Sequence, residues 1–151
     1  MTFTLLWVED DPDDLLLGGR AMRKAGFEKP MVARDGEEAI AYLAGHGRFA
    51  HRLEHPLPSL VLLDLKLPRK SGFEVMRWIR GREGLKRTPL VVLSSSQERH
   101  DIERAYDCGA NAYLVKPVAT KMFVEILRGL HLFWATFNNT VDSALVQPSS
   151  R

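Results

Sequence analysis

Five short apolar runs alternate with longer amphipathic segments along this chain, and this alternation narrows the possible folds more than any other feature. The runs cover residues 5–8, 31–33, 60–63, 89–93 and 112–115. The run at 60–63 is the clearest, because an unbroken apolar stretch of this length is typical of a parallel strand covered on both faces. Parallel strands need long crossover connections, which amphipathic helices supply.

The segments between the runs carry apolar residues at helical spacing. We expect helices around residues 15–22, 37–43, 73–79, 102–106 and 119–133. The stretch 45–58 has no such period and ends in two prolines, so it is interpreted as an extended connection. The sequence therefore predicts an α/β fold, a doubly wound five-stranded parallel sheet sandwiched by five helices. Gly18-Gly19 would cost the first helix about 1 kcal/mol per glycine against alanine, and no sequence pattern explains the pair.

Length and composition favour one domain in a reducing compartment. Of the 151 residues, 1–137 are expected to form that domain and the polar stretch 138–151 a disordered tail. Lysine and arginine total 21 against 19 acids, and the resulting charge of +2 gives no case for nucleic acid or a membrane surface. The single cysteine, Cys108, excludes an internal disulfide. No run reaches the ~20 apolar residues of a membrane helix and no leader is evident, so we expect a cytoplasmic location.

Polar side chains follow four of the five predicted strands. Glu9-Asp10 follows the first strand, Asp64 the third, Ser94 the fourth and Lys116 the fifth. Because the carboxyl ends of parallel strands meet at one edge of the sheet, these groups are expected to converge. Clustered carboxylates repel unless a cation is present, and their oxygens suit Mg²⁺, or Mn²⁺, before softer metals. Asp64 in such a site is a carboxylate able to attack phosphorus.

The ordered set Glu9-Asp10, Asp64, Ser94 and Lys116-Pro117 resembles the receiver domain of two-component response regulators, which are CheY-like proteins. The resemblance covers roughly residues 3–134. It implies a flavodoxin-like fold with strand order 2-1-3-4-5. It also implies that Asp64 is the phosphoacceptor and that the metal binds Asp64, Asp10 directly, Glu9 through water, and the main-chain carbonyl of Lys66.

The same resemblance implies roles for the remaining strand-end residues. Lys116 would bind the phosphoryl oxygens, while Ser94 and Tyr113 would form a switch pair, the hydroxyl moving to the phosphoryl group and the ring turning inward. The donor would be a phosphohistidine on a sensor kinase. The chain would then be a stand-alone switch, not an enzyme, that catalyses only its own phosphorylation and dephosphorylation.

In two further features the sequence resembles the small stand-alone response regulators of bacterial phytochrome kinases. One is the long connection at 45–58, and the other is the aromatic run 131–134 where a helix would normally end in polar residues. The similarity implies a phytochrome-type kinase as partner. It also implies a homodimer through the fourth helix, fifth strand, fifth helix and carboxyl extension, where Phe133, Trp134 and Phe137 would make the contact.

Two alternatives remain at this point. A small Mg²⁺-dependent phosphohydrolase would also use Asp64 as nucleophile, although haloacid-dehalogenase-type enzymes carry a second acid where this chain has Lys66, and the chain has no room for a cap domain. A pseudo-receiver that is never phosphorylated is the other alternative. Outside the set of strand-end residues, Asp13 and Asp14 are interpreted as acids that favour the dipole at a helix N-terminus.

Overall fold

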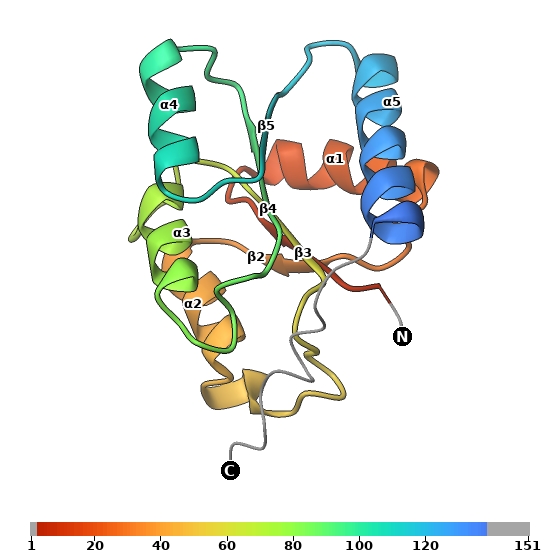
Figure 1. The fold of residues 1–151 in the computed structure, drawn as a ribbon. Coiled ribbons are helices and arrows are strands. Elements are labelled where there is room, and N and C mark those ends of the chain that lie inside the picture. The colour runs from red at the N-terminus through yellow and green to blue at the C-terminus, as the bar shows by residue number, and fades with distance from the viewer. Residues whose placement is uncertain (1–2, 139–151) are drawn as a thin grey trace.

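The computed structural model describes residues 3–138, which form a single parallel sheet with helices on both faces (Figure 1). The strands are β1 (Leu5–Val8), β2 (Met31–Ala33), β3 (Leu60–Leu63), β4 (Leu90–Ser94) and β5 (Ala112–Val115). All are parallel, in the order β2-β1-β3-β4-β5. The predicted fold class and strand order are therefore confirmed.

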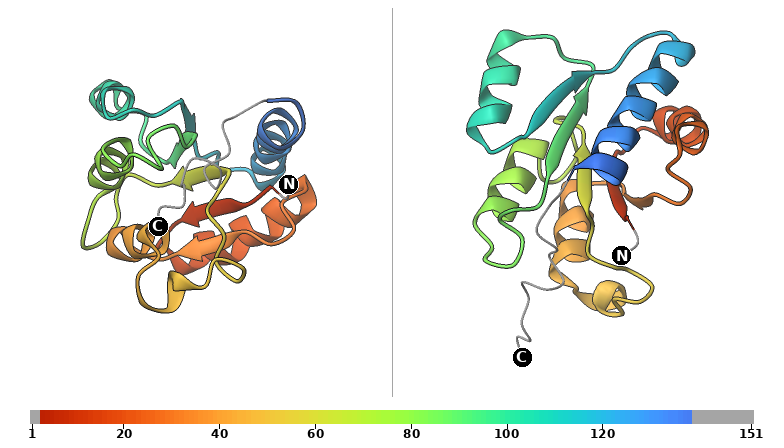
Figure 2. Two further views of the ribbon diagram at one scale, coloured as in Figure 1. Left: turned by 60° about the horizontal axis from the view of Figure 1, so that its bottom comes forward. Right: turned by 45° about the vertical axis from the view of Figure 1, so that its right-hand side comes forward.

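Five helices form the two outer layers; four of them connect consecutive strands, and α5 follows the last strand. They are α1 (Pro12–Ala25), α2 (Gly36–Ala44), α3 (Gly72–Arg80), α4 (Arg99–Asp107) and α5 (Thr120–His131). Helices α1 and α5 cover one face of the sheet, and α2, α3 and α4 cover the other (Figure 2). None of the helices within residues 3–138 is long and apolar enough to cross a membrane.

The central strands β1 and β3 are apolar throughout because both of their faces are covered. Leu6 and Val8 of β1 join the core beneath α2, α3 and α4, whereas Leu5 and Trp7 join the core beneath α1 and α5. All four side chains are at most 3% exposed. This two-sided burial is the physical reason why the strand sequences lack the alternation of polar and apolar residues that a half-exposed sheet requires.

Helix α1 begins immediately after the polar end of β1. The carboxylate of Asp11 accepts hydrogen bonds from the main-chain N–H groups of Asp13 and Asp14, at 2.8 and 3.2 Å, and Pro12 occupies the first helical position. Gly26 ends the helix with a φ of 115°, in the left-handed region that glycine adopts without strain. The cap fixes the direction of the first turn, and with it the positions of the acidic side chains that follow Asp11.

The connection between α2 and β3 is more ordered than the sequence predicts. It contains a short 3₁₀ helix, η1 (Gly47–Ala50). The guanidinium of Arg52 donates hydrogen bonds to the carbonyls of Tyr42 and Leu43, both at 2.8 Å, and to that of His55 at 3.1 Å. These bonds satisfy carbonyls that the end of α2 leaves without helical partners. The interpretation of 45–58 as an extended connection is therefore wrong for this part of the loop.

The chain also stays helical beyond the predicted end of the last helix. After α5 it continues as a π-helix, η2 (Leu132–Phe137), in which the N–H of Asn138 donates to the carbonyl of Phe133. The predicted tail at 138–151 lies outside the described residues, apart from Asn138.

The glycine pair in α1 has an explanation at one of its two positions. A methyl group on Gly18 would lie 2.8 Å from Cη2 of Trp7, whose ring fills the space between α1 and the sheet. On Gly19 the nearest atom would be Nη1 of Arg23, at an ordinary 3.8 Å. Helix α1 therefore packs closely on the sheet only because residue 18 has no side chain.

Gly18→Ala and Gly19→Ala are expected to change stability in opposite directions. The first forces the buried Trp7 ring to move, and overpacking of about 1–3 kcal/mol outweighs the gain of about 1 kcal/mol in helix propensity, leaving a loss of up to about 2 kcal/mol. The second gains helix propensity without a clash and should stabilise the protein by up to about 1 kcal/mol. Urea unfolding followed by circular dichroism measures both, and a change of the same sign in the two variants would contradict this packing.

Candidate functional site

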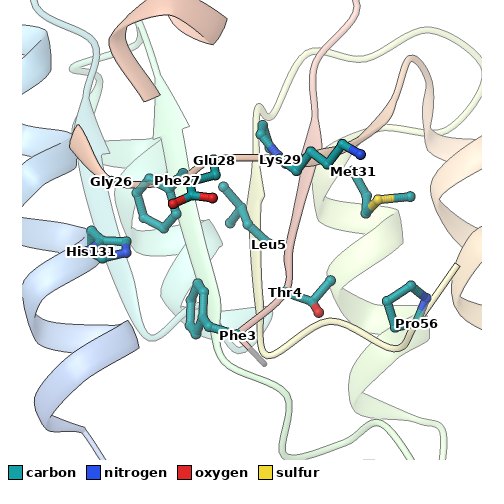
Figure 3. A pocket seen from close by; sticks show the side chains of 11 residues that line it. Phe3, Thr4, Leu5, Gly26, Phe27, Glu28, Lys29, Met31, Pro56 and His131 are labelled. Atoms are coloured by element: carbon teal, nitrogen blue, oxygen red, sulfur yellow. The ribbon is translucent and has the colours of Figure 1, made fainter. Parts of the chain in front are cut away.

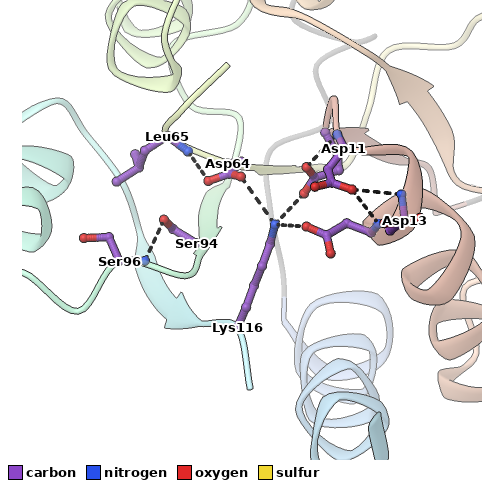
Figure 4. A network of polar contacts seen from close by, with 9 residues as sticks. Asp11, Asp13, Asp64, Leu65, Ser94, Ser96 and Lys116 are labelled. Carbon is purple, nitrogen blue, oxygen red and sulfur yellow. Dashed lines mark hydrogen bonds and ion pairs between the residues drawn. The ribbon is translucent and has the colours of Figure 1, made fainter. Parts of the chain in front are cut away.

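The polar residues predicted at the strand ends meet at one edge of the sheet. Strand register aligns Val8 with Leu63 and Ser94 with Val115, so the residues that follow these strands emerge side by side. Figure 4 shows the side chain of Lys116 extending toward Asp64 and toward the carboxylates at the start of α1, with Ser94 on the neighbouring strand end. The predicted convergence is therefore confirmed for Glu9, Asp64 and Lys116.

Lys116 is the centre of the network. Its Nζ donates to Oε1 of Glu9 at 2.6 Å, to Oδ2 of Asp14 at 2.9 Å and to Oδ2 of Asp64 at 3.3 Å. The side chain is only 15% exposed. Burial alone would lower the pKa of the ammonium, but the hydrogen bonds to Glu9 and Asp14 and the charge of Asp64 raise this pKa above its usual range. Lys116 is therefore a fixed positive charge in the site.

Glu9 is the most deeply buried acid of the site, at 1% exposure. Burial raises the pKa of its carboxyl, while the hydrogen bond and charge of Lys116 act in the opposite direction. The N–H of Asp11 donates to its second oxygen, Oε2, at 3.2 Å. A carboxylate removed from water in this way needs a cation beside it, and Lys116 is that cation in the described structure.

Asp64 is held from two sides at the carboxyl end of β3. The N–H of Leu65 donates to its Oδ1 at 2.7 Å, and Lys116 contacts its Oδ2. Helix α3 starts close by: the N–H of Gly72 donates to the carbonyl of Leu65 at 2.8 Å, and a Cβ on Gly72 would collide with the carbonyl of Asp64. The position of Asp64 therefore depends on a glycine at the start of α3.

Of the described residues predicted to bind a metal, only Glu9 and Asp64 share a contact, which is with Lys116. Asp10 is exposed next to Glu9, and Lys66 is exposed in the loop after β3. Within residues 3–138 no three His, Cys, Asp or Glu side chains are grouped closely enough to hold a metal ion, and the Lys116 ammonium contacts both Glu9 and Asp64. The chemistry of the donor set nevertheless fits a hard cation, because it offers carboxylate oxygens on adjacent strands.

Ser94 and Tyr113 are joined through Ser96. The hydroxyl of Ser94, which is 2% exposed, accepts a hydrogen bond from the N–H of Ser96 at 3.2 Å. The Tyr113 hydroxyl donates to the carbonyl of Ser96 at 2.9 Å, and the ring packs against the core beneath α2, α3 and α4. The Ser96 hydroxyl donates to Oδ2 of Asp101 in α4 at 2.6 Å. A continuous hydrogen-bond chain thus runs from Ser94 to β5 and α4.

The aromatic residues predicted to form a partner face have different environments. Phe133 is 53% exposed, whereas Trp134 is partly buried against the core beneath α1 and α5. The two rings meet edge to face with centroids 5.1 Å apart. The side chain of Phe137 lies outside what the structure describes.

His131 begins the aromatic run and has a packing role. Its ring stands edge-on to Phe27 with centroids 4.8 Å apart, at the rim of a cavity of about 410 Å³ (Figure 3). Phe3 also borders this cavity, which lies where β1 begins, at the opposite end of the strand from Glu9. His131 therefore ends α5 by packing on the loop after α1.

Asp14 is the site residue that the sequence interpretation missed. It was assigned to the dipole of α1 together with Asp13, yet its carboxylate contacts Lys116 while Asp13 is exposed. The spacing contained the signal: Asp14 precedes Gly18 by four residues and Ala21 by seven, and both are buried. Positions four and seven apart share one face of a helix, so Asp14 belongs to the inward face of α1.

Known proteins are similar to this chain in both sequence and fold. Residues 5–128 match the family described as response regulator receiver domain. The response regulator Rcp1 of Synechocystis sp. is 34% identical over 131 residues, which cover 86% of this chain and 87% of Rcp1. The Mn²⁺-bound form of Rcp1 has a TM-score of 0.81 at 32% identity, covering 93% of this chain and 99% of that one.

Two other solved structures are similar. The phosphorylated cyanobacterial phytochrome response regulator RcpA has a TM-score of 0.85 at 34% identity, covering 94% of this chain and all of RcpA. The bacteriophytochrome response regulator RtBRR has a TM-score of 0.74 at 40% identity, covering 96% and 87% of the two chains.

Proposed function

This chain belongs to the response regulator receiver domain family, a family of signalling proteins, and on that premise we propose that Asp64 is its phosphoacceptor. The observation that carries the proposal is the environment of the Asp64 carboxylate. One oxygen is held by the N–H of Leu65, and the other faces the Lys116 ammonium at the carboxyl edge of the sheet. A carboxylate fixed beside a permanent positive charge is suited to accept a dianionic group.

The proposed reaction is phosphoryl transfer from a histidine. An oxygen of Asp64 forms a bond to phosphorus, the bond from phosphorus to the donor nitrogen breaks, and the imidazole leaves with a proton. Lys116 donates hydrogen bonds to the phosphoryl oxygens and balances part of their charge. Water later hydrolyses the acyl phosphate and restores Asp64. The chain would thus catalyse only its own phosphorylation and dephosphorylation.

The receiver family binds divalent metal, and we assign that role here to Mg²⁺. Its protein ligands would be the carboxylates of Asp10, Asp64 and, through water, Glu9, together with the main-chain carbonyl of Lys66. The ion would supply positive charge opposite the phosphoryl oxygens. Rcp1, a relative that has been solved in a Mn²⁺-bound form, supports the choice of a hard divalent cation.

A phytochrome-type histidine kinase is the proposed phosphoryl donor. Support comes from the relatives RcpA and RtBRR, which are described as phytochrome and bacteriophytochrome response regulators and match nearly the whole chain. The cytoplasmic location expected from the sequence stays a prediction.

The proposed output is a change at the α4–β5–α5 face that alters dimerisation. Ser94 would turn its hydroxyl to the phosphoryl group and weaken its bond from the N–H of Ser96. Ser96 also accepts from Tyr113 and donates to Asp101, so its displacement reaches β5 and α4 together. Phe133, which is half exposed beyond α5, would contribute to the contact between copies.

Transfer from a phytochrome-type kinase tests the proposed function. Radiolabel should move from the autophosphorylated kinase to this chain, and the phosphorylated chain should change its molar mass in size-exclusion chromatography with light scattering. Ser94→Ala removes the sensing hydroxyl and should still accept label while losing the change in molar mass. Absence of label on the wild type would contradict the proposed donor, and an unaltered response of Ser94→Ala would contradict the switch pair.

A further inference from the structure

Asp14 is the one partner of Lys116 that lies on a helix and not at a strand end. It belongs to the first turn of α1, is 45% exposed at its side chain, and contacts Nζ at 2.9 Å. The other two partners, Glu9 and Asp64, are both proposed as metal ligands. A divalent cation that takes those carboxylates competes with the ammonium for the same oxygens.

The three carboxylates do not contribute equally to holding the Lys116 ammonium once a metal ion has taken two of them. An ammonium has three donors, and all three are used in the described structure. Losing the second or third partner costs little, whereas an ammonium that is 15% exposed and has no partner carries most of the penalty of a buried, unpaired charge. The last carboxylate that remains therefore matters most, and it is Asp14.

The surroundings also give the Lys116 side chain room to change its partners. Glu9, Asp14 and Lys116 line a cavity of about 120 Å³ between the sheet and the start of α5, which Trp7 and Phe123 close from the apolar side. The contact with Asp64, at 3.3 Å, is the longest of the three. The ammonium is thus held more closely by Glu9 and Asp14 than by the phosphoacceptor.

We propose that Asp14 is a positioning residue that retains Lys116 in the site when a divalent cation binds the strand-end carboxylates, and that it thereby raises the affinity for that cation. The inference rests on the proposed function, because it takes Glu9 and Asp64 as metal ligands. It assigns to α1 a direct influence on the metal site without making Asp14 a ligand.

The chain offers a matched control one residue away. Asp14→Asn and Asp13→Asn each remove one negative charge from the first turn of α1 and leave the Asp11 cap in place, but only the first removes the negative charge of a Lys116 partner. Binding of Mn²⁺ is measured as the decrease in the electron paramagnetic resonance signal of the free ion. Binding of Mg²⁺ is measured by its competition with Mn²⁺. We expect Asp14→Asn to weaken both affinities about 5- to 10-fold, and Asp13→Asn by no more than about twofold, since its charge is exposed and screened.

The same titration in a background that lacks the ammonium distinguishes two effects of Asp14. One is its positioning of Lys116, and the other is the direct attraction of its charge for the metal ion. With Lys116→Met, the difference between Asp14→Asn and Asp13→Asn should disappear; if Lys116→Met does not fold, Lys116→Gln replaces it. Equal affinities of the two asparagine variants overturn the inference alone, and so does a difference that persists without Lys116. A wild-type chain that binds neither ion overturns the metal site and the inference together.

Discussion

Lys116→Met is expected to lower the free energy of unfolding by about 3 kcal/mol at pH 7, because it leaves the buried carboxylate of Glu9 without a cation. Glu9 is 1% exposed, and Lys116 Nζ is 2.6 Å from its Oε1. The only other group that contacts this carboxylate among the described residues is the N–H of Asp11, at 3.2 Å. Methionine keeps the length and the apolar packing of the lysine stem, so the loss reports on charge.

The destabilisation should depend on pH in a definite direction. Burial raises the pKa of Glu9 above 4.5, and Lys116 lowers it, so the substitution raises this pKa further. A folded state that holds the proton more tightly than the unfolded chain loses stability as pH rises above about 4.5, until the folded-state pKa is passed. The stability gap between Lys116→Met and the wild type should therefore shrink as pH falls from 7 toward 4.5.

Urea unfolding at several pH values measures this gap, and a second substitution supplies the control. Glu9→Gln in the Lys116→Met background removes the buried charge and should recover most of the lost stability at pH 7. A loss of stability that is the same at pH 5 and pH 7, or that Glu9→Gln does not relieve, would show that Lys116 stabilises the protein by packing instead of charge.

The sheet was predictable because its physical cause is local in the sequence. The central strands β1 and β3 are buried on both faces and are apolar at every position, and the helices between strands carry the periodicity of their one buried face. The ends of α1 also have local causes, namely the side chain of Asp11 and the glycine at position 26. The convergence of Glu9, Asp64 and Lys116 then followed from topology, because parallel strands expose their carboxyl ends at one edge.

The features that the sequence did not predict depend on tertiary contacts between different elements of the fold. Gly18 is explained by the ring of Trp7, and the loop after α2 by the reach of Arg52 to the carbonyls of Tyr42 and Leu43. Asp14 is the clearest example. Asp13 and Asp14 are adjacent and identical in residue type, and they differ only in which side of α1 their side chains occupy.

The second prediction with a large effect concerns the proposed phosphoacceptor, Asp64. Asp64→Asn should remove phosphorylation completely, because an amide cannot form the acyl phosphate, while the asparagine still accepts from the N–H of Leu65 and keeps its place at the end of β3. Lys116 loses one ion-pair partner but keeps Glu9 and Asp14, so the substitution should weaken the folded state only slightly. Unfolding curves of the variant verify that loss of reaction is not loss of fold.

Intact mass after incubation with acetyl phosphate tests the central claim most directly. The wild type with Mg²⁺ should gain the mass of one phosphoryl group, and the adduct should be absent when EDTA replaces Mg²⁺ and absent in Asp64→Asn. A wild-type chain that gains no mass while the donor stays intact would contradict phosphorylation at Asp64, as would an adduct that persists in Asp64→Asn.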